Sequence, residues 1–129
     1  MAFTDDLKFD AAGLIPAVVQ DADNGQVLMV AWMNREAVEK TFETGLAHYY
    51  SRSRKKQWLK GESSGHTQRV LEARTDCDSD VLLIKVEQQS GACHMGYRSC
   101  FFRLRTAEGG TVEDGQKMFD PGEVYGSKS

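Results

Sequence analysis

Two apolar runs joined by a tight turn signal constrain the fold of this chain more than any other feature. The runs extend from Ile15 to Gln20 and from Val27 to Met33, and the dipeptide Asn24-Gly25 lies between them. Asparagine and glycine both tolerate a positive φ, so this pattern predicts a β-hairpin. Four further short strands are expected at residues 47–53, 68–75, 81–87 and 100–105. We therefore predict a mainly β fold with few helices.

One helix is expected between the second and third strands. Asn34 is a suitable N-cap residue, and Gly45 is suited to the C-terminal end of the same helix. The spacing of apolar residues predicts a buried side formed by Ala37, Val38, Thr41 and Phe42.

Length and charge exclude several classes of protein. The 129 residues fit one domain, which we assign to residues 1–106, and residues 107–129 read as a Gly-rich C-terminal extension without a motif. The formal net charge is -3, which argues against nucleic-acid binding because that requires a basic face. The N-terminus lacks the pattern of a signal peptide, and no run is long enough to span a membrane. We expect a cytoplasmic protein that binds neither nucleic acid nor membranes.

The first polar cluster is basic and rich in serine, and it covers residues 51–56 and 60–66. Such residues hold phosphate groups through charge, hydroxyl groups and backbone N–H groups. The candidate phosphate contacts are Arg52, Arg54, Lys60, Ser63, Ser64 and His66. On a strand, Arg52 and Arg54 share one face. The competing interpretation is a solvated basic turn, because charge runs usually lie on the surface.

The second cluster is acidic and places Asp76, Asp78 and Asp80 at alternate positions. Carboxylate ligands of this kind suit Mg²⁺ or Ca²⁺. If the segment is extended, the three carboxylates share one side and Cys77 points to the other. An EF-hand loop is excluded, because Val81 stands where that loop needs glycine. The alternative is an acidic turn that leads into a strand.

The third cluster contains Cys93, His94 and Cys100. The spacing of the two cysteines matches no common zinc-finger pattern, and free cysteines are often simply buried. Cys77 is the third cysteine of the chain. Three thiolates with one open position are typical of a catalytic zinc site, whereas a structural site usually fills all four positions. Buried thiols, a reactive thiol and zinc ligands remain as alternatives.

These clusters lie within longer stretches that resemble the phosphoribosyl-AMP cyclohydrolase family of histidine biosynthesis. The matching stretches are VLMVAWMNREAVEKTFETGLAHYYSRSR, WLKGESSGHTQ, DCDSD and SGACHMGYRSCFF. They occur in the right order between Val27 and Phe102, and the tail after Thr106 adds no match. The resemblance implies an α+β, mainly β fold with few helices, a compact sheet or pseudo-barrel in a single domain, that forms an obligate dimer.

The resemblance also implies two metals and a reaction. Zinc is expected at Cys93 and Cys100 together with Cys77 of the partner subunit, and Mg²⁺ at the three aspartates of residues 76–80. The implied reaction hydrolyses the N1–C6 bond of the adenine ring in 1-(5-phosphoribosyl)-AMP, which gives the phosphoribosyl-formimino aminoimidazole carboxamide ribotide. Zinc lowers the pKa of bound water toward about 7. His94 is the candidate to take and return the proton, with packing as its alternative role.

Two other classes of protein share some of these features. One is a non-enzymatic zinc module that binds RNA or protein through residues 52–60. This interpretation does not explain the acidic cluster, and the low pI of about 5.6 argues against it. A zinc-dependent base deaminase also attacks a ring carbon. Its His-x-Glu and Pro-Cys-x-x-Cys motifs are both missing from the sequence, so this class is excluded.

Overall fold

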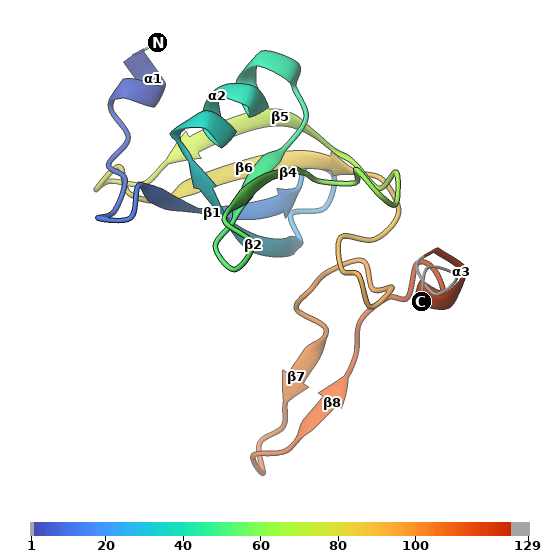
Figure 1. Cartoon of the computed structure of the whole chain (residues 1–129). Helices are drawn as coiled ribbons and strands as arrows, with labels where there is room; N and C mark the ends of the chain where they lie inside the picture. The colour runs from blue at the N-terminus through green and yellow to red at the C-terminus, as the bar shows by residue number, and fades with distance from the viewer. Residues whose placement is uncertain (1, 125–129) are drawn as a thin grey trace.

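Strands dominate the computed structural model, which describes residues 2–124 (Figure 1). Its elements are α1 (Ala2–Asp5), β1 (Leu14–Asp21), β2 (Val27–Asn34), α2 (Arg35–Thr44), β3 (His48–Ser51), β4 (Lys56–Leu59), β5 (Gln68–Thr75), β6 (Leu82–Gln88), β7 (Arg103–Arg105), β8 (Thr111–Glu113) and α3 (Pro121–Val124). The predicted mainly β class with few helices is therefore confirmed. Within residues 2–124, none of the helices has the length and apolar character needed to cross a membrane.

The main sheet has the strand order β2-β1-β6-β5. β1 and β2 pair antiparallel, so the hairpin predicted from Asn24-Gly25 is confirmed, and Gly25 has the positive φ of 78° that this turn requires. β6 pairs in parallel with β1 and antiparallel with β5. Because β6 crosses the sheet as an extended strand, the loops before and after it lie at opposite ends of the sheet.

The helix α2 begins and ends where its capping residues predict. The side chain of Asn34 accepts a hydrogen bond from the N–H of Ala37 at 2.9 Å, and Gly45 closes the helix with a φ of 81°. Burial of Ala37, Val38 and Thr41 is confirmed. The prediction for Phe42 is wrong, because this side chain is 41% exposed. Phe42 lies at the flank of the helix, where its ring meets that of Phe3 of α1 at 5.7 Å.

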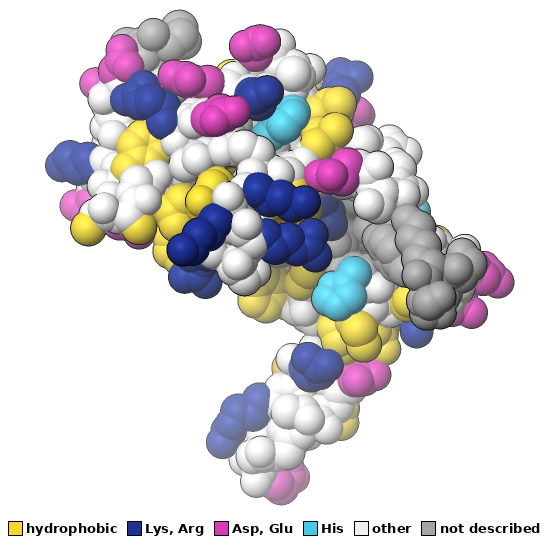
Figure 2. Space-filling view, in the orientation of Figure 1, with side chains coloured by type: hydrophobic (Ala, Val, Ile, Leu, Met, Phe, Trp, Pro, Cys, Tyr) yellow, Lys and Arg dark blue, Asp and Glu magenta, His cyan; other side chains and the backbone are white. Residues whose placement is uncertain are grey.

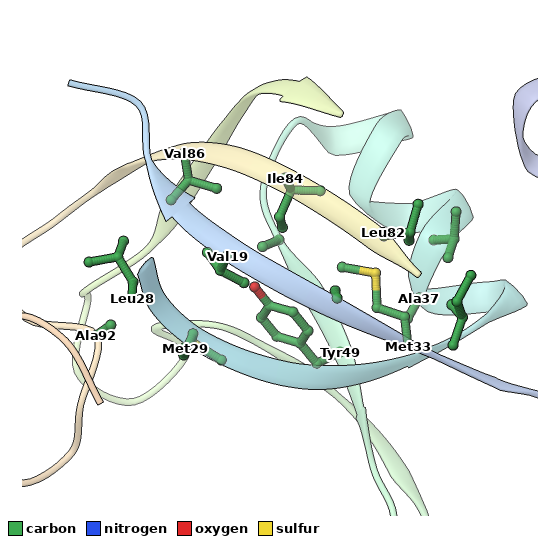
Figure 3. Packing of buried hydrophobic residues seen from close by; sticks show 14 of the residues in the cluster. Val19, Leu28, Met29, Met33, Ala37, Tyr49, Leu82, Ile84, Val86 and Ala92 are labelled. Atoms are coloured by element: carbon green, nitrogen blue, oxygen red, sulfur yellow. The ribbon is translucent and has the colours of Figure 1, made fainter. Parts of the chain in front are cut away.

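The core lies between one face of the main sheet and the segment formed by α2 and β3 (Figure 3). Val19 of β1 and Tyr49 of β3 are completely buried. In β6, Leu82, Ile84 and Val86 are buried and alternate with more exposed residues, as the sequence pattern predicted. Each such apolar side chain stabilises the fold by about 1.5–3 kcal/mol on burial. This core fixes the strands from which the loops of the candidate site emerge.

Two predicted strands are shorter in the structure, and each pairs with a strand that the sequence did not predict. The strand expected at 47–53 ends at Ser51, because residues 52–55 turn, with Lys55 at a φ of 55°, into β4. The strand expected at 100–105 is reduced to β7, which pairs with β8. β4 has four residues and β8 has three, too few to show an alternating pattern in the sequence.

The β7–β8 hairpin extends away from the main sheet (Figure 1). The predicted domain boundary at Thr106 falls in the turn of this hairpin. Tyr97 and Lys117 form an isolated bridge beyond it, so the chain returns from the hairpin to the body of the protein. Residues 125–129 of the predicted extension lie outside the described residues.

Candidate active site

A cavity of about 580 Å³ opens beside β4, the loop that follows β4, and the loop after β6. Its lining comprises Met29, Ser51, Ser53, Arg54, Trp58, Leu59, Lys60, Gly61, Glu62, Ser63, Ser64, Ala92, His94 and Cys100. Figure 2 shows Lys and Arg side chains gathered over the β3–β4 hairpin, with a histidine side chain beside them. Cavities of this size hold small-molecule ligands and cofactors.

Two of the three cysteines meet in the loop of residues 89–102, here called the cysteine loop. Cys93 is buried and Cys100 is exposed toward the cavity, and a hydrogen bond joins their side chains. Partial desolvation and the neighbouring Cys93 raise the pKa of the Cys100 thiol to about 11, although the charge of Lys60 opposes this rise. Adjacent sulfur ligands of this kind form a donor set that zinc prefers.

The third cysteine lies far from this pair within one chain. Cys77 is exposed in the turn before β6, whereas Cys93 follows the end of β6. A strand of seven residues such as β6 spans about 20 Å, at about 3.3 Å per residue. Among residues 2–124, the group of three or more metal-ligating side chains that comes together consists of aspartates alone. A single chain therefore holds the Cys93–Cys100 pair at one end of the sheet, with Cys100 lining the cavity, and Cys77 at the opposite end.

The three aspartates come together in the turn between β5 and β6. One carboxylate oxygen from each of Asp76, Asp78 and Asp80 lies within 4.8 Å of the others, and all three residues are exposed. The sequence was compatible with an extended segment or with a turn, and the structure shows a turn. The carboxylate of Asp76 closes it by accepting hydrogen bonds from the N–H groups of Asp80 and Val81. This turn thus brings the carboxylates together by a route other than strand alternation.

The predicted phosphate contacts separate into two groups. Those that line the cavity are Arg54, Lys60, Ser63 and Ser64. Exposed His94 lines the same cavity. Arg52 lies over the ring of Trp32 at 4.6 Å and lines a neighbouring cavity of about 540 Å³. His66 packs against Phe119, with 4.6 Å between ring centroids, outside the lining of the first cavity.

Lys60 lies at the wall that carries the thiol pair. Its ammonium group donates a hydrogen bond to the carbonyl oxygen of Ala92 at 2.6 Å. Burial lowers the pKa of Lys60, while the nearby Cys100 and Cys93 act in the opposite direction. Burial also lowers the pKa of His66, and the charge of Lys60 adds to that effect. The hydrogen bond to Ala92, which precedes Cys93, and the cavity lining shared with Cys100 place the Lys60 side chain beside the thiol pair.

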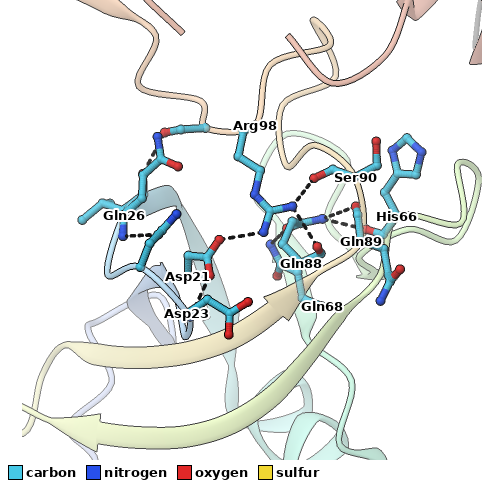
Figure 4. A network of polar contacts seen from close by, with 12 residues as sticks. Asp21, Asp23, Gln26, His66, Gln68, Gln88, Gln89, Ser90 and Arg98 are labelled. Carbon is cyan, nitrogen blue, oxygen red and sulfur yellow. Dashed lines mark hydrogen bonds and ion pairs between the residues drawn. The ribbon is translucent and has the colours of Figure 1, made fainter. Parts of the chain in front are cut away.

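An arginine that the sequence reasoning passed over anchors the cysteine loop. Arg98 donates hydrogen bonds to the carboxylate of Asp21 at 2.6 Å, to the carbonyl oxygen of Gln88 at 2.8 Å and to the carbonyl oxygen of Ser90 (Figure 4). Only 16% of the Arg98 side chain and 4% of the Asp21 side chain are exposed. Burial alone raises the pKa of Asp21, but the hydrogen bond from Arg98 and those from backbone N–H groups outweigh it and lower the pKa.

The cysteine loop is also tied to the start of β2. The N–H of Cys100 donates to the carbonyl oxygen of Leu28 at 2.7 Å, and the hydroxyl of Ser99 donates to that of Val27 at 2.7 Å. No local signal in the sequence identifies these contacts, because the partners are more than 70 positions apart. The loop therefore holds its cysteines through long-range contacts and not through its own turn propensity.

Replacement of Arg98 by methionine is expected to destabilise the protein by about 3–5 kcal/mol, the usual effect of leaving one member of a buried ion pair without its partner. Urea unfolding of metal-free protein at fixed protein concentration measures this loss. Arg69→Met serves as the control, because its pair with Glu87 is exposed and is worth at most about 1 kcal/mol. A similar small loss in both variants would show that the Arg98 pair does not anchor the loop.

Comparison with known proteins identifies the family. The family model for phosphoribosyl-AMP cyclohydrolase matches residues 29–102. A phosphoribosyl-AMP cyclohydrolase of Methanococcoides burtonii is 60% identical over 121 residues, which cover 94% of this chain and 97% of the relative. Those of Chlorobium chlorochromatii and Pelotomaculum thermopropionicum are 55% and 56% identical, over 97% and 96% of this chain and 91% and 96% of the relatives. Alignments of this length also include part of the segment after Thr106. This chain therefore belongs to the phosphoribosyl-AMP cyclohydrolase family.

Proposed function

We propose that this chain hydrolyses the N1–C6 bond of the adenine ring in 1-(5-phosphoribosyl)-AMP, a step of histidine biosynthesis. The observation that carries the proposal is the cavity, which places the Cys100 thiol, a histidine and a basic, serine-rich wall within reach of one ligand. In the reaction, the oxygen of water bonds to C6, the C6–N1 bond breaks, and a proton passes from the water to N1. The product is the phosphoribosyl-formimino aminoimidazole carboxamide ribotide.

The thiol pair fits a zinc ion. Cys93 and Cys100 supply two adjacent sulfur ligands, and the third is assigned to Cys77 of the partner subunit. The position of Cys77 at the opposite end of β6 supports this assignment, because three thiols do not meet within residues 2–124 of one chain. Zinc, when bound, polarises water and makes it a nucleophile near neutral pH. The ring carbon C6 needs such a nucleophile.

A homodimer with shared active sites follows from this ligand set. The exposed apolar side chains on and beside the protruding β7–β8 hairpin support it, since they favour burial against a partner. Phe101, Leu104 and Val112 are 61%, 53% and 47% exposed in the single chain. A hairpin that extends from the body offers little buried surface to its own chain and is suited to reach a second one.

The aspartate turn is assigned to Mg²⁺. Its three exposed carboxylates concentrate negative charge within a few ångströms. Coordination of a hard cation by their oxygens relieves the repulsion between these charges. Cys77 lies in the same turn, between Asp76 and Asp78. A partner subunit that brings Cys77 to the thiol pair thus brings the aspartates to the same cavity, where Mg²⁺ can neutralise a substrate phosphate.

The serine-rich loop is assigned to the second phosphate. Ser63, Ser64 and Arg54 line the cavity and offer hydroxyl and guanidinium donors. Gly61 shapes this loop, since it has a φ of 88° and a Cβ atom there would lie 2.7 Å from the backbone of His66. Arg52 lines the neighbouring cavity and extends the basic surface of the turn between β3 and β4.

His94 is assigned to proton transfer, because it is an exposed imidazole in the cavity wall one residue from Cys93. His94→Ala is expected to lower kcat by about 10²- to 10⁴-fold, the usual contribution of a general acid–base group. The variant is expected to keep its zinc and its fold, which metal analysis and thermal denaturation check. A rate within a few-fold of the parent protein would assign His94 to packing.

The proposed function is tested by an ultraviolet assay of ring opening with phosphoribosyl-AMP. We expect turnover that requires both bound zinc and added Mg²⁺, with chelators removing the activity. A filter-binding assay with RNA tests the non-enzymatic zinc module, whose contact surface in residues 52–60 overlaps the cavity lining at Arg54, Trp58 and Lys60. RNA binding without turnover of phosphoribosyl-AMP would reverse the assignment.

A further inference from the structure

Lys60 is a cation without a carboxylate partner in the wall of the cavity. No ion pair joins it to an aspartate or glutamate within residues 2–124. Its ammonium group is instead fixed by the carbonyl oxygen of Ala92 at 2.6 Å, and Ala92 is adjacent to Cys93. The side chain lines the same cavity as Cys100. The ammonium group of Lys60 is thus held beside the loop that carries the thiol pair.

A half-buried ammonium group is costly unless a nearby negative charge compensates it. Glu62 lines the same cavity, but its carboxylate accepts a hydrogen bond from the N–H of Leu59 and forms no ion pair with Lys60. Cys100 also lines the cavity, Cys93 follows Ala92, and both acquire negative charge when zinc binds them as thiolates. Three thiolates around one Zn²⁺ ion leave a net charge of -1. A fixed cation beside two of the three ligands offsets this excess.

We propose that Lys60 is a positioning residue of the zinc centre, which stabilises the thiolates of Cys93 and Cys100 by its charge. This inference rests on the zinc site of the proposed function, and it differs from the phosphate contact predicted for Lys60 from the sequence. A phosphate contact strengthens substrate binding alone. A charge-compensating residue strengthens zinc binding in the absence of substrate.

The test compares zinc affinities of the full-length protein, measured by competition with a chromophoric chelator and without substrate. Lys60→Gln keeps a hydrogen-bond donor for the Ala92 carbonyl but removes the charge, and Lys60→Arg keeps both. We expect zinc affinity to fall by about 10- to 100-fold in Lys60→Gln, the usual effect of losing a partner of the metal ligands, and to recover in Lys60→Arg. Lys60→Met is expected to resemble Lys60→Gln.

Lys56→Met is the matched control, because it removes the same charge from an exposed site on the same strand–loop segment. Its zinc affinity is expected to equal that of the parent protein. A structural role for Lys60 predicts a lower melting temperature of the metal-free protein, whereas charge compensation predicts a melting temperature within a few degrees of the parent, because an unpaired cation is removed.

The inference is overturned if the zinc affinity of Lys60→Gln is within about twofold of that of the parent protein. A variant that then shows only a raised KM would identify Lys60 as a contact to a substrate phosphate. If Lys60→Met does not fold, the affinities of the glutamine and arginine variants decide. If the parent protein binds no zinc, the proposed function itself is contradicted. If the parent protein and Lys60→Gln bind zinc equally well, only the inference about Lys60 is contradicted.

Discussion

Serine in place of Cys93 is expected to abolish zinc binding and turnover together. Cys93 is 5% exposed and lies in a loop that the buried Arg98–Asp21 pair holds in place. Serine is close to cysteine in size, so the loop is expected to keep its conformation. A serine hydroxyl does not replace a thiolate as a zinc ligand, because its proton is held far more tightly.

Metal analysis of the purified protein measures the first effect, and the ultraviolet assay of ring opening measures the second. The parent protein is expected to contain about one zinc ion per chain, as for one site in each subunit. Thermal denaturation of metal-free Cys93→Ser and metal-free parent protein is the control for folding. Full zinc content in the variant would remove Cys93 from the ligand set.

Mixing Cys77→Ser with Cys93→Ser subunits is expected to restore about one quarter of the parental activity from two inactive proteins. In a mixed dimer, one site receives Cys77 from the Cys93→Ser chain and takes Cys93 and Cys100 from the Cys77→Ser chain. That site is intact, whereas the other has lost two ligands. Random pairing makes half of the dimers mixed, and one of their two sites is active, which gives the quarter.

Refolding the two variants together and assaying the mixture against each variant alone measures this recovery. Zinc bound within single chains predicts the opposite result, because both sites of every mixed dimer then lack a ligand and activity stays near zero. That outcome contradicts the shared site but leaves zinc binding intact. Zinc is also expected to stabilise the dimer when the site is shared, because it bonds both chains in the assembled state only.

The local structure of this protein was largely predictable. The hairpin at Asn24-Gly25 and the helix between Asn34 and Gly45 depend on turn and capping preferences that act over a few residues. The burial of Phe42 was predicted wrongly. Helical periodicity identifies the side of a helix that faces the core, but it does not show whether other elements cover the residues at the margin of that side. Its covering comes from Phe3, which is far away in the sequence.

The acidic turn shows how a correct grouping can have a different geometric cause. Strand alternation predicted three carboxylates on one side of residues 76–80. The structure brings the carboxylates together by a turn, in which Asp76 accepts hydrogen bonds from backbone N–H groups. Spacing by two residues is compatible with both geometries, so the sequence alone did not distinguish them.

The sequence by itself determined the residue types of the site and their family, because cysteines, aspartates and a basic serine-rich segment stand in a rare order. Only the tertiary structure decided which of them meet. It placed Cys77 at the far end of β6 from Cys93, directed Lys60 at the carbonyl of Ala92, and joined Arg98 to Asp21 across 77 positions. Such contacts arise from sheet topology and from the need to pair buried charge, and neither leaves a local pattern in the chain.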